Sequence, residues 1–128
     1  MRLLLDTHAL LWAAADDERL SPAAREAIED PANDLLFSAI SAFEIAVKVA
    51  LGKLDLPDEP ATFIGTRVAA FGLRALPVTV EHAIEAGALP PIHGDPWDRM
   101  LVAQARIESV PILTADPTIR RYDVETIW

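Results

Sequence analysis

Four carboxylates, far apart along the chain, stand where a metal site could be built: Asp6, Glu44, Asp98 and Asp116. Asp6 directly follows an apolar run of three leucines, and Asp116 comes just after the run Pro111–Thr114. Several hard oxygen ligands without any cysteine suit Mg²⁺ or Mn²⁺ better than zinc. The pattern predicts a divalent cation site if the fold brings these acids together.

Each acid taken singly also has an ordinary structural explanation. Aspartate is a favoured N-cap, and carboxylates are stabilised in the first turn of a helix. Asp95 and Asp116 each precede a proline, Asp98 stands where a capping-box acid would, and Ser41-x-x-Glu44 has the capping-box spacing. For any one residue this explanation is the stronger one, so the argument for a metal site rests on the four acids jointly.

The elements that would position the acids follow from the apolar pattern. An unbroken apolar run over residues 3–5 is typical of a strand buried on both faces of a parallel sheet. Ile40, Phe43, Val47 and Leu51 recur at helical spacing and predict a helix. Further predicted strands are 35–38, 73–80, 111–114 and 124–128, and further predicted helices are 7–15, one from 21–22, 61–71, 81–86, 95–109 and a short one from 116–117.

Strands alternate with helices throughout, which predicts one domain over residues 1–128 with a three-layer α/β/α sandwich and a mostly parallel central sheet. In such sheets, ligands bind at the edge formed by the carboxyl ends of the strands. Asp6, Glu44, Asp98 and Asp116 each follow a strand or lie in the first turns of a helix that begins near that edge. We therefore expect all four to line one crevice, where their mutual repulsion favours a bound cation.

Composition excludes several other classes. The 128 residues carry a net charge of -9, which argues against wide contact with a phosphate backbone, so any nucleic-acid chemistry must rest on a local site. The absence of cysteine excludes disulfides and thiol nucleophiles and fits a reducing compartment, so we expect a cytoplasmic protein. Asp6 interrupts the first apolar run too early for a signal peptide, and no stretch predicts a membrane span.

Four blocks of the chain resemble the PIN-domain ribonucleases, specifically the VapC-type toxins of toxin–antitoxin pairs. They come in family order, cover nearly the whole chain, and span residues 3–8, 38–54, 93–105 and 113–116. The resemblance implies that the family's acidic metal site falls on Asp6, Glu44, Asp98 and Asp116. Of the two aspartates in the third block, Asp98 is the implied ligand, and Asp95 is either the N-cap alone or also a group that supports the site or contacts the substrate. Asp116 is either a ligand or a cap that supports the site.

The reaction implied by the resemblance is hydrolysis of an RNA phosphodiester by an Mg²⁺- or Mn²⁺-dependent endoribonuclease. Thr7 and Thr114 stand beside two of the acids and either orient a ligand or water or cap the chain locally. Arg99 either contacts the scissile phosphate or pairs with a neighbouring carboxylate. Trp97 either stacks on a base or anchors its helix.

The scattered histidines His8, His82 and His93 have no metal-ligand spacing, and we interpret them as structural or surface residues. The implied partners are a cognate antitoxin, RNA and a second copy of the chain, in a homodimer and a toxin–antitoxin hetero-oligomer without any membrane. The antitoxin's C-terminal segment would place a basic side chain in the acidic pocket. Leu10, Leu11 and Trp12 either line an apolar groove for it or pack in the core.

Two alternatives stay open from the sequence. A PIN-like scaffold without activity would bind partners only, although the presence of all four acids argues against lost catalysis. An aspartate-dependent phosphatase of the haloacid dehalogenase type also places an aspartate after a strand, but it needs a second aspartate two positions on. His8 occupies that position.

Overall fold

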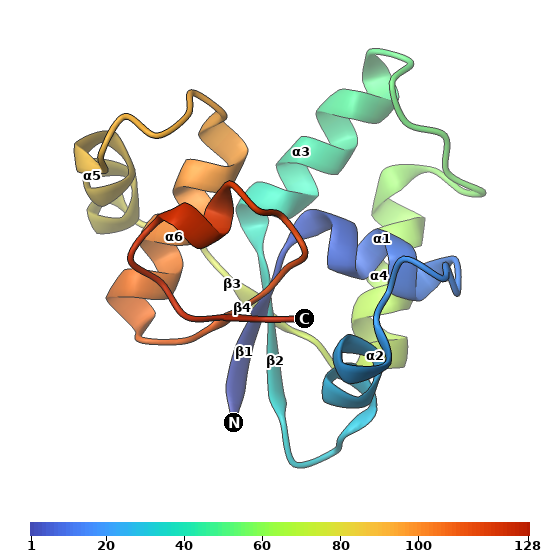
Figure 1. Cartoon of the computed structure of the whole chain (residues 1–128). Coiled ribbons are helices and arrows are strands. Elements are labelled where there is room, and N and C mark those ends of the chain that lie inside the picture. The colour runs from blue at the N-terminus through green and yellow to red at the C-terminus, as the bar shows by residue number, and fades with distance from the viewer.

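The computed structural model describes residues 1–128 and contains a five-stranded, fully parallel sheet in the order β3-β2-β1-β4-β5 (Figure 1). The elements in chain order are β1 (Arg2–Leu5), α1 (Thr7–Ala14), α2 (Pro22–Glu29), β2 (Asp34–Ser38), α3 (Ala39–Ala50), α4 (Pro60–Phe71), β3 (Arg74–Leu76), α5 (Val80–Ala88), α6 (Pro96–Glu108), β4 (Ile112–Leu113), the 3₁₀ helix η1 (Ile119–Arg121) and β5 (Thr126–Ile127). None of the helices combines the length and the apolar character needed to cross a membrane.

Strand β1 lies at the centre of the sheet, and its leucines explain why. Leu3, Leu4 and Leu5 are fully buried because helices cover both faces of the strand. Side chains alternate along a strand, so Leu4 contributes to one core cluster while Leu3 and Leu5 contribute to the other. The predicted strand buried on both faces is therefore confirmed.

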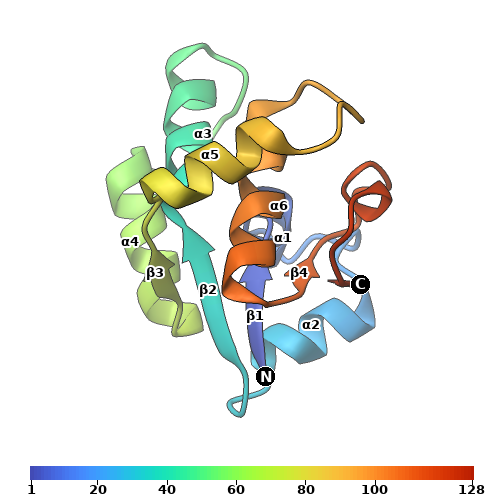
Figure 2. The same ribbon diagram turned by 90° about the vertical axis from the view of Figure 1, so that its left-hand side faces the viewer.

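Helices cover the two faces of the sheet as separate layers. The core cluster that contains Leu4 includes residues of α5 and α6, and the cluster that contains Leu3 and Leu5 includes residues of α1, α2 and α3. Figures 1 and 2 show α5 and α6 on one side of the sheet and α1, α2 and α4 on the other. This arrangement is the predicted three-layer α/β/α sandwich.

The order of the strands creates a crevice at a defined place. From β1 the chain proceeds through β2 to β3 on one side, and β4 and β5 are then added on the other side of β1. The direction of winding thus reverses between β1 and β4, and connections from neighbouring strands leave the sheet in opposite directions there. Asp6 follows β1 and Thr114 follows β4, so both lie at this switch point.

The structure corrects the predicted cap and apolar stripe of α3. The helix begins at Ala39 with Ser38 as N-cap, so Ser41 and Glu44 lie inside it and do not form a capping box. Phe43 is 57% exposed, whereas Ser41 and Glu44 are buried against neighbouring elements. The helical spacing was right, but tertiary packing turns a polar side of α3 inward.

Several boundaries also differ from the prediction, most clearly those of β3 and α5 and the segment after Asp116. The third strand is limited to Arg74–Leu76, because Thr79 caps α5 and the helix already begins at Val80. Helix α5 extends to Ala88, two residues beyond its predicted end at residue 86. Asp116 opens a turn and not a helix: its side chain accepts from the Thr118 amide at 2.7 Å, and η1 begins only at Ile119.

Candidate active site

Asp6 is positioned by β1 and by the first turn of α1 together. Its Oδ1 accepts a hydrogen bond from the Ala9 amide at 2.7 Å, which makes Asp6 the N-cap of α1. Its Oδ2 accepts a hydrogen bond from the Thr114 hydroxyl. Burial raises the pKa of Asp6, although both hydrogen bonds act in the opposite direction. The structural and chemical interpretations of this residue are thus compatible, because one carboxylate caps the helix and lies in the crevice.

Thr114 connects two of the acids across the switch point. Its buried hydroxyl donates to Asp6 and accepts from the Asp116 amide at 3.0 Å. Asp116 and Asp6 lie close enough for their charges to interact. A cavity of about 310 Å³ opens beside them, lined by Asp6, His8, Trp12, Ala115, Asp116 and Pro117. The Thr114 hydroxyl thus contacts an acid and also caps the chain locally, so these contacts fit both of its interpretations.

Glu44 reaches the crevice from the second turn of α3. Although only 5% exposed, it accepts from the Thr7 hydroxyl at 2.7 Å through Oε1 and pairs with Lys48, one turn later, through Oε2. The Thr7 hydroxyl also lies 2.9 Å from the Ser41 hydroxyl. Thr7 therefore orients Glu44 just as Thr114 orients Asp6, and Lys48 partly neutralises Glu44.

Asp98 faces these acids from the first turn of α6. Its neighbour Asp95 is the N-cap, with its carboxylate accepting from the amides of Trp97 and Asp98 at 2.9 and 3.2 Å. The Asp98 carboxylate is left for the crevice, where His93 Nε2 lies 3.4 Å from Oδ2. Burial and the charges of Asp95 and Asp116 raise the pKa of Asp98 to about 7. Asp95 is thus the N-cap, as predicted, and the role of Asp98 as a ligand stays a prediction.

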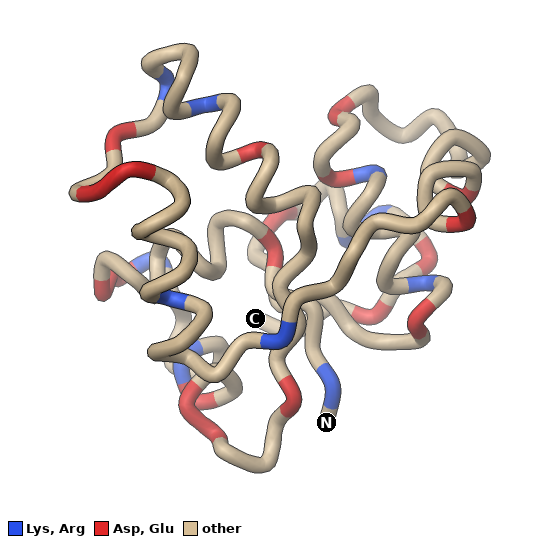
Figure 3. Tube along the Cα trace, turned by 180° about the vertical axis from the view of Figure 1, so that it is seen from behind, with Lys and Arg blue, Asp and Glu red and all other residues tan.

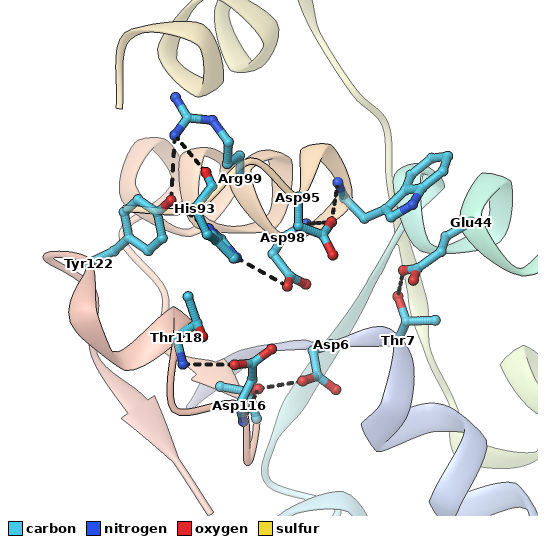
Figure 4. Close-up of polar contacts among 12 residues, drawn as sticks. Asp6, Thr7, Glu44, His93, Asp95, Asp98, Arg99, Asp116, Thr118 and Tyr122 are labelled. Atoms are coloured by element: carbon cyan, nitrogen blue, oxygen red, sulfur yellow. Dashed lines mark hydrogen bonds and ion pairs between the residues drawn. The ribbon is translucent and has the colours of Figure 1, made fainter. Parts of the chain in front are cut away.

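Asp6, Asp98 and Asp116 face one another in Figure 4, and Glu44 lies to one side of them, beside Thr7. Asp116 and Glu44 both contribute to the raised pKa of Asp98, and Asp116 contributes to that of Asp6. No three of these side chains approach closely enough to form a finished metal cage. The oxygen donors nevertheless fit a divalent cation, because a positive charge among them would offset both the burial and the mutual repulsion that raise the pKa of Asp98.

Arg99 differs from both predictions made for it. Its guanidinium is directed at backbone carbonyls, with Nη1 donating to Pro90 O at 3.0 Å and Nη2 to Ala86 O and Leu89 O at 2.9 and 3.0 Å. It therefore pairs with no carboxylate and does not point at the crevice as a phosphate ligand would. Its fork of donors fixes the end of α5 and the following loop on α6.

His93 was interpreted as structural or surface, and this was incomplete, because its ring lies between Asp98 and Tyr122. No spacing in the sequence signals this contact, since Tyr122 follows 29 residues later. His82 fits the structural interpretation: it is buried, and its Nδ1 accepts from the Thr79 amide at 3.0 Å. Trp97 packs edge-on against Phe43 of α3, with centroids 5.3 Å apart, and thereby anchors its helix.

Comparison with known proteins identifies the family of this chain. Residues 3–125 match the model of the PIN domain. The chain belongs to the PIN domain family. Ribonuclease VapC22 of Mycobacterium tuberculosis is 34% identical to this PIN domain over 121 residues, which cover 94% of this chain and 91% of VapC22. That similarity places the chain among the VapC-type members. Ribonuclease VapC16 of the same organism is 39% identical over 59 residues, or 46% of this chain and 40% of VapC16.

Solved structures support the same fold. The PIN domain superimposes with a TM-score of 0.73 and 14% identity on a chain of VapBC2 from Rickettsia felis bound to a promoter DNA fragment, covering 99% of this chain and 98% of that one. A chain of DNA-bound VapBC from Salmonella typhimurium gives a TM-score of 0.65 at 15% identity, covering 99% and 97%. At these identities the likeness concerns the fold alone.

Proposed function

We propose that this protein is the toxin subunit of a VapBC-type pair and acts as a metal-dependent endoribonuclease. The observation that carries the proposal is the convergence of Asp6, Glu44, Asp98 and Asp116 at the switch point of the sheet. The similarity over most of its length to a ribonuclease, VapC22, supports the same reaction. We propose a single domain over residues 1–128 with Mg²⁺ or Mn²⁺ as cofactor.

The chain's own residues prepare the site in three ways. Asp6, Asp98, Glu44 and Asp116 supply oxygen donors, and buried Thr7 and Thr114 hold two of these carboxylates in fixed directions. The apolar layers beneath the crevice keep water from the back of the carboxylates, which strengthens their interaction with a cation. A bound divalent cation would supply the Lewis acidity that activates a water and stabilises the leaving oxygen.

The acidic net charge of the protein argues against an extended RNA-binding surface. Asp and Glu outnumber Lys and Arg by 20 to 11, and acidic segments occur in all parts of the fold (Figure 3). Such a surface repels an extended phosphate backbone, so we propose that RNA binds through few contacts, close to the cation site. An exposed or unpaired region of RNA meets this condition better than a long duplex.

A groove beside the crevice supports the proposed antitoxin partner. It encloses about 380 Å³ between α1, the loop after α3 and α4, and its apolar lining includes Leu11, Trp12, Leu56 and Phe63. Trp12 and His8 line both this groove and the cavity at Asp6, so a segment in the groove leads directly to the acids. We propose that the antitoxin's C-terminal segment binds here and brings a basic side chain to the carboxylates. Leu10 is buried in the core instead.

The proposed homodimer draws support from exposed apolar side chains on α3 and α5. Phe43, Val80 and Ile84 are 57%, 77% and 68% exposed, so an interface over them would remove apolar surface from water. We propose that a second copy covers them. Sedimentation of the antitoxin-free protein tests this, with Ile84→Glu expected to give monomers.

The proposed activity is tested with antitoxin-free protein and total cellular RNA, in Mg²⁺, in Mn²⁺ and in EDTA. We expect discrete cleavage with either metal, none in EDTA, and losses of at least about 100-fold for Asp6→Asn and Asp98→Asn. Asp123→Asn is the matched control, because the Asp123 side chain is fully exposed and pairs with Arg106 rather than with the candidate site. Sequencing the cleaved ends would name the RNA.

The outcomes separate the proposal from the binding scaffold. If the folded wild-type protein cleaves no RNA in either metal but binds its antitoxin, the protein is a scaffold. If cleavage persists unchanged in both site variants, the carboxylates do not carry the reaction.

A further inference from the structure

A chain of polar contacts leads from Arg99 to the carboxylate of Asp98. Arg99 Nη1 lies 3.4 Å from the Tyr122 hydroxyl, which lies 2.8 Å from His93 Nδ1, and His93 Nε2 lies 3.4 Å from Asp98 Oδ2 (Figure 4). Tyr122 is 5% exposed and His93 is largely covered. Three separate parts of the chain are thus joined at one acid of the candidate site.

The donor and acceptor capacities of these groups set the direction of each hydrogen bond in the series. A guanidinium can only donate, so the Tyr122 oxygen accepts from Arg99. The Tyr122 proton has His93 Nδ1 as its acceptor among these contacts, so we assign the tautomer of His93 that accepts at Nδ1 and carries its proton on Nε2. In this tautomer Nε2 is a donor 3.4 Å from Asp98 Oδ2.

The surroundings hold this arrangement in place. The Arg99 guanidinium also donates to Ala86 O and Leu89 O, which fixes its own orientation. Tyr122 belongs to the core cluster under α6, and its ring packs on that of His93 with centroids 5.5 Å apart. His93 therefore has a packed wall behind it and a single polar partner, Asp98, toward the crevice.

We propose that His93 is a positioning residue for Asp98. By donating to Oδ2, it would fix the rotation of the Asp98 carboxylate, which would then be held in one orientation for the proposed cation. This inference rests on the proposed function, in which Asp98 is a ligand. Groups that orient a metal ligand in this way typically contribute 10- to 100-fold to metal affinity.

Two variants of His93 distinguish its proposed effect on the orientation of Asp98 from an effect of its packing. His93→Gln keeps an amide donor near the position of Nε2, whereas His93→Asn is too short to reach Asp98. In isothermal titration with MnCl₂, we expect His93→Asn to weaken Mn²⁺ binding at least about tenfold and His93→Gln to recover most of it. In RNA cleavage, His93→Asn should need a higher Mn²⁺ concentration than His93→Gln, and both variants should reach a similar rate at saturating Mn²⁺.

A second measurement needs no metal and no RNA. Long-range ¹H–¹⁵N NMR of the metal-free protein at pH 8 should show His93 protonated at Nε2 alone, and a mixture of tautomers in Tyr122→Phe. Equal Mn²⁺ affinity in His93→Asn and wild type would overturn the positioning role while leaving the proposed function standing. If the wild type and Asp98→Asn show no difference in Mn²⁺ binding, the metal site itself is refuted, and this inference with it.

Discussion

Replacing Asp98 by asparagine should make the metal-free protein more stable at neutral pH. The pKa of Asp98 is raised from 3.8 to about 7 by burial and by the neighbouring charges of Asp95 and Asp116. Between these two pKa values the folded protein binds more protons than the unfolded chain, so wild-type stability falls as the pH rises from about 4 to about 7. Asparagine carries no charge and keeps an acceptor for His93.

The magnitude follows from the size of the shift. About 3 pKa units at about 1.4 kcal/mol each give about 4 kcal/mol as a ceiling at pH 7.5. The Asp98 side chain is 20% exposed, and salt screens part of the repulsion, so we expect about 2 kcal/mol. At pH 4.5 the carboxyl is already protonated in the folded protein, and the ceiling falls to about 1 kcal/mol. For a domain of this size, 2 kcal/mol raises Tm by roughly 6–10 °C.

Urea unfolding in EDTA at pH 7.5 and pH 4.5 measures both values, with Asp123→Asn as the matched control. We expect Asp98→Asn to be the more stable protein at pH 7.5, to lose most of that advantage at pH 4.5, and to lack RNA cleavage. A variant that is equally stable or less stable than the wild type at pH 7.5 would refute the claim that repulsion and burial act on Asp98. Added Mg²⁺ should stabilise the wild type more than the variant.

Three further outcomes test the contacts around the site. Thr114→Val removes the donor to Asp6, and calorimetric titration should show Mn²⁺ binding weakened about tenfold. Arg99→Lys loses the forked contacts with backbone carbonyls, so urea unfolding should show a loss of about 1–3 kcal/mol, and unchanged stability would contradict this role. Lys48→Met removes the cation paired with Glu44, and Mn²⁺ should then bind up to about fivefold more tightly, whereas weaker binding would indicate that Lys48 supports the metal.

Local pattern determined much of this fold. The leucines of β1 predicted a strand covered on both faces, because only a central strand of an α/β sandwich removes three consecutive leucines from water. Ser21-Pro22 and Asp95-Pro96 predicted helix starts, and both are N-cap and first-turn pairs in the structure. The four acids were predicted to share a crevice because the carboxyl ends of parallel strands lie on one edge.

Contacts between residues that lie far apart in the chain could not be predicted from the sequence. The spacing of Ser41 and Glu44 fits a capping box, yet α3 begins earlier, and Thr7 and Lys48 determine how Glu44 is held. Arg99 has the charge for a phosphate or a carboxylate, but the loop after α5 surrounds it with carbonyls.

His93 illustrates best why such contacts could not be predicted from the sequence. Its role depends on Tyr122, 29 residues away, and on a loop whose path is fixed by Arg99. Periodicity and capping rules act over a few residues, so the sequence by itself determined the elements and the edge where the acids meet. Only the tertiary structure decided which neighbours orient each carboxylate, because those neighbours come from other elements.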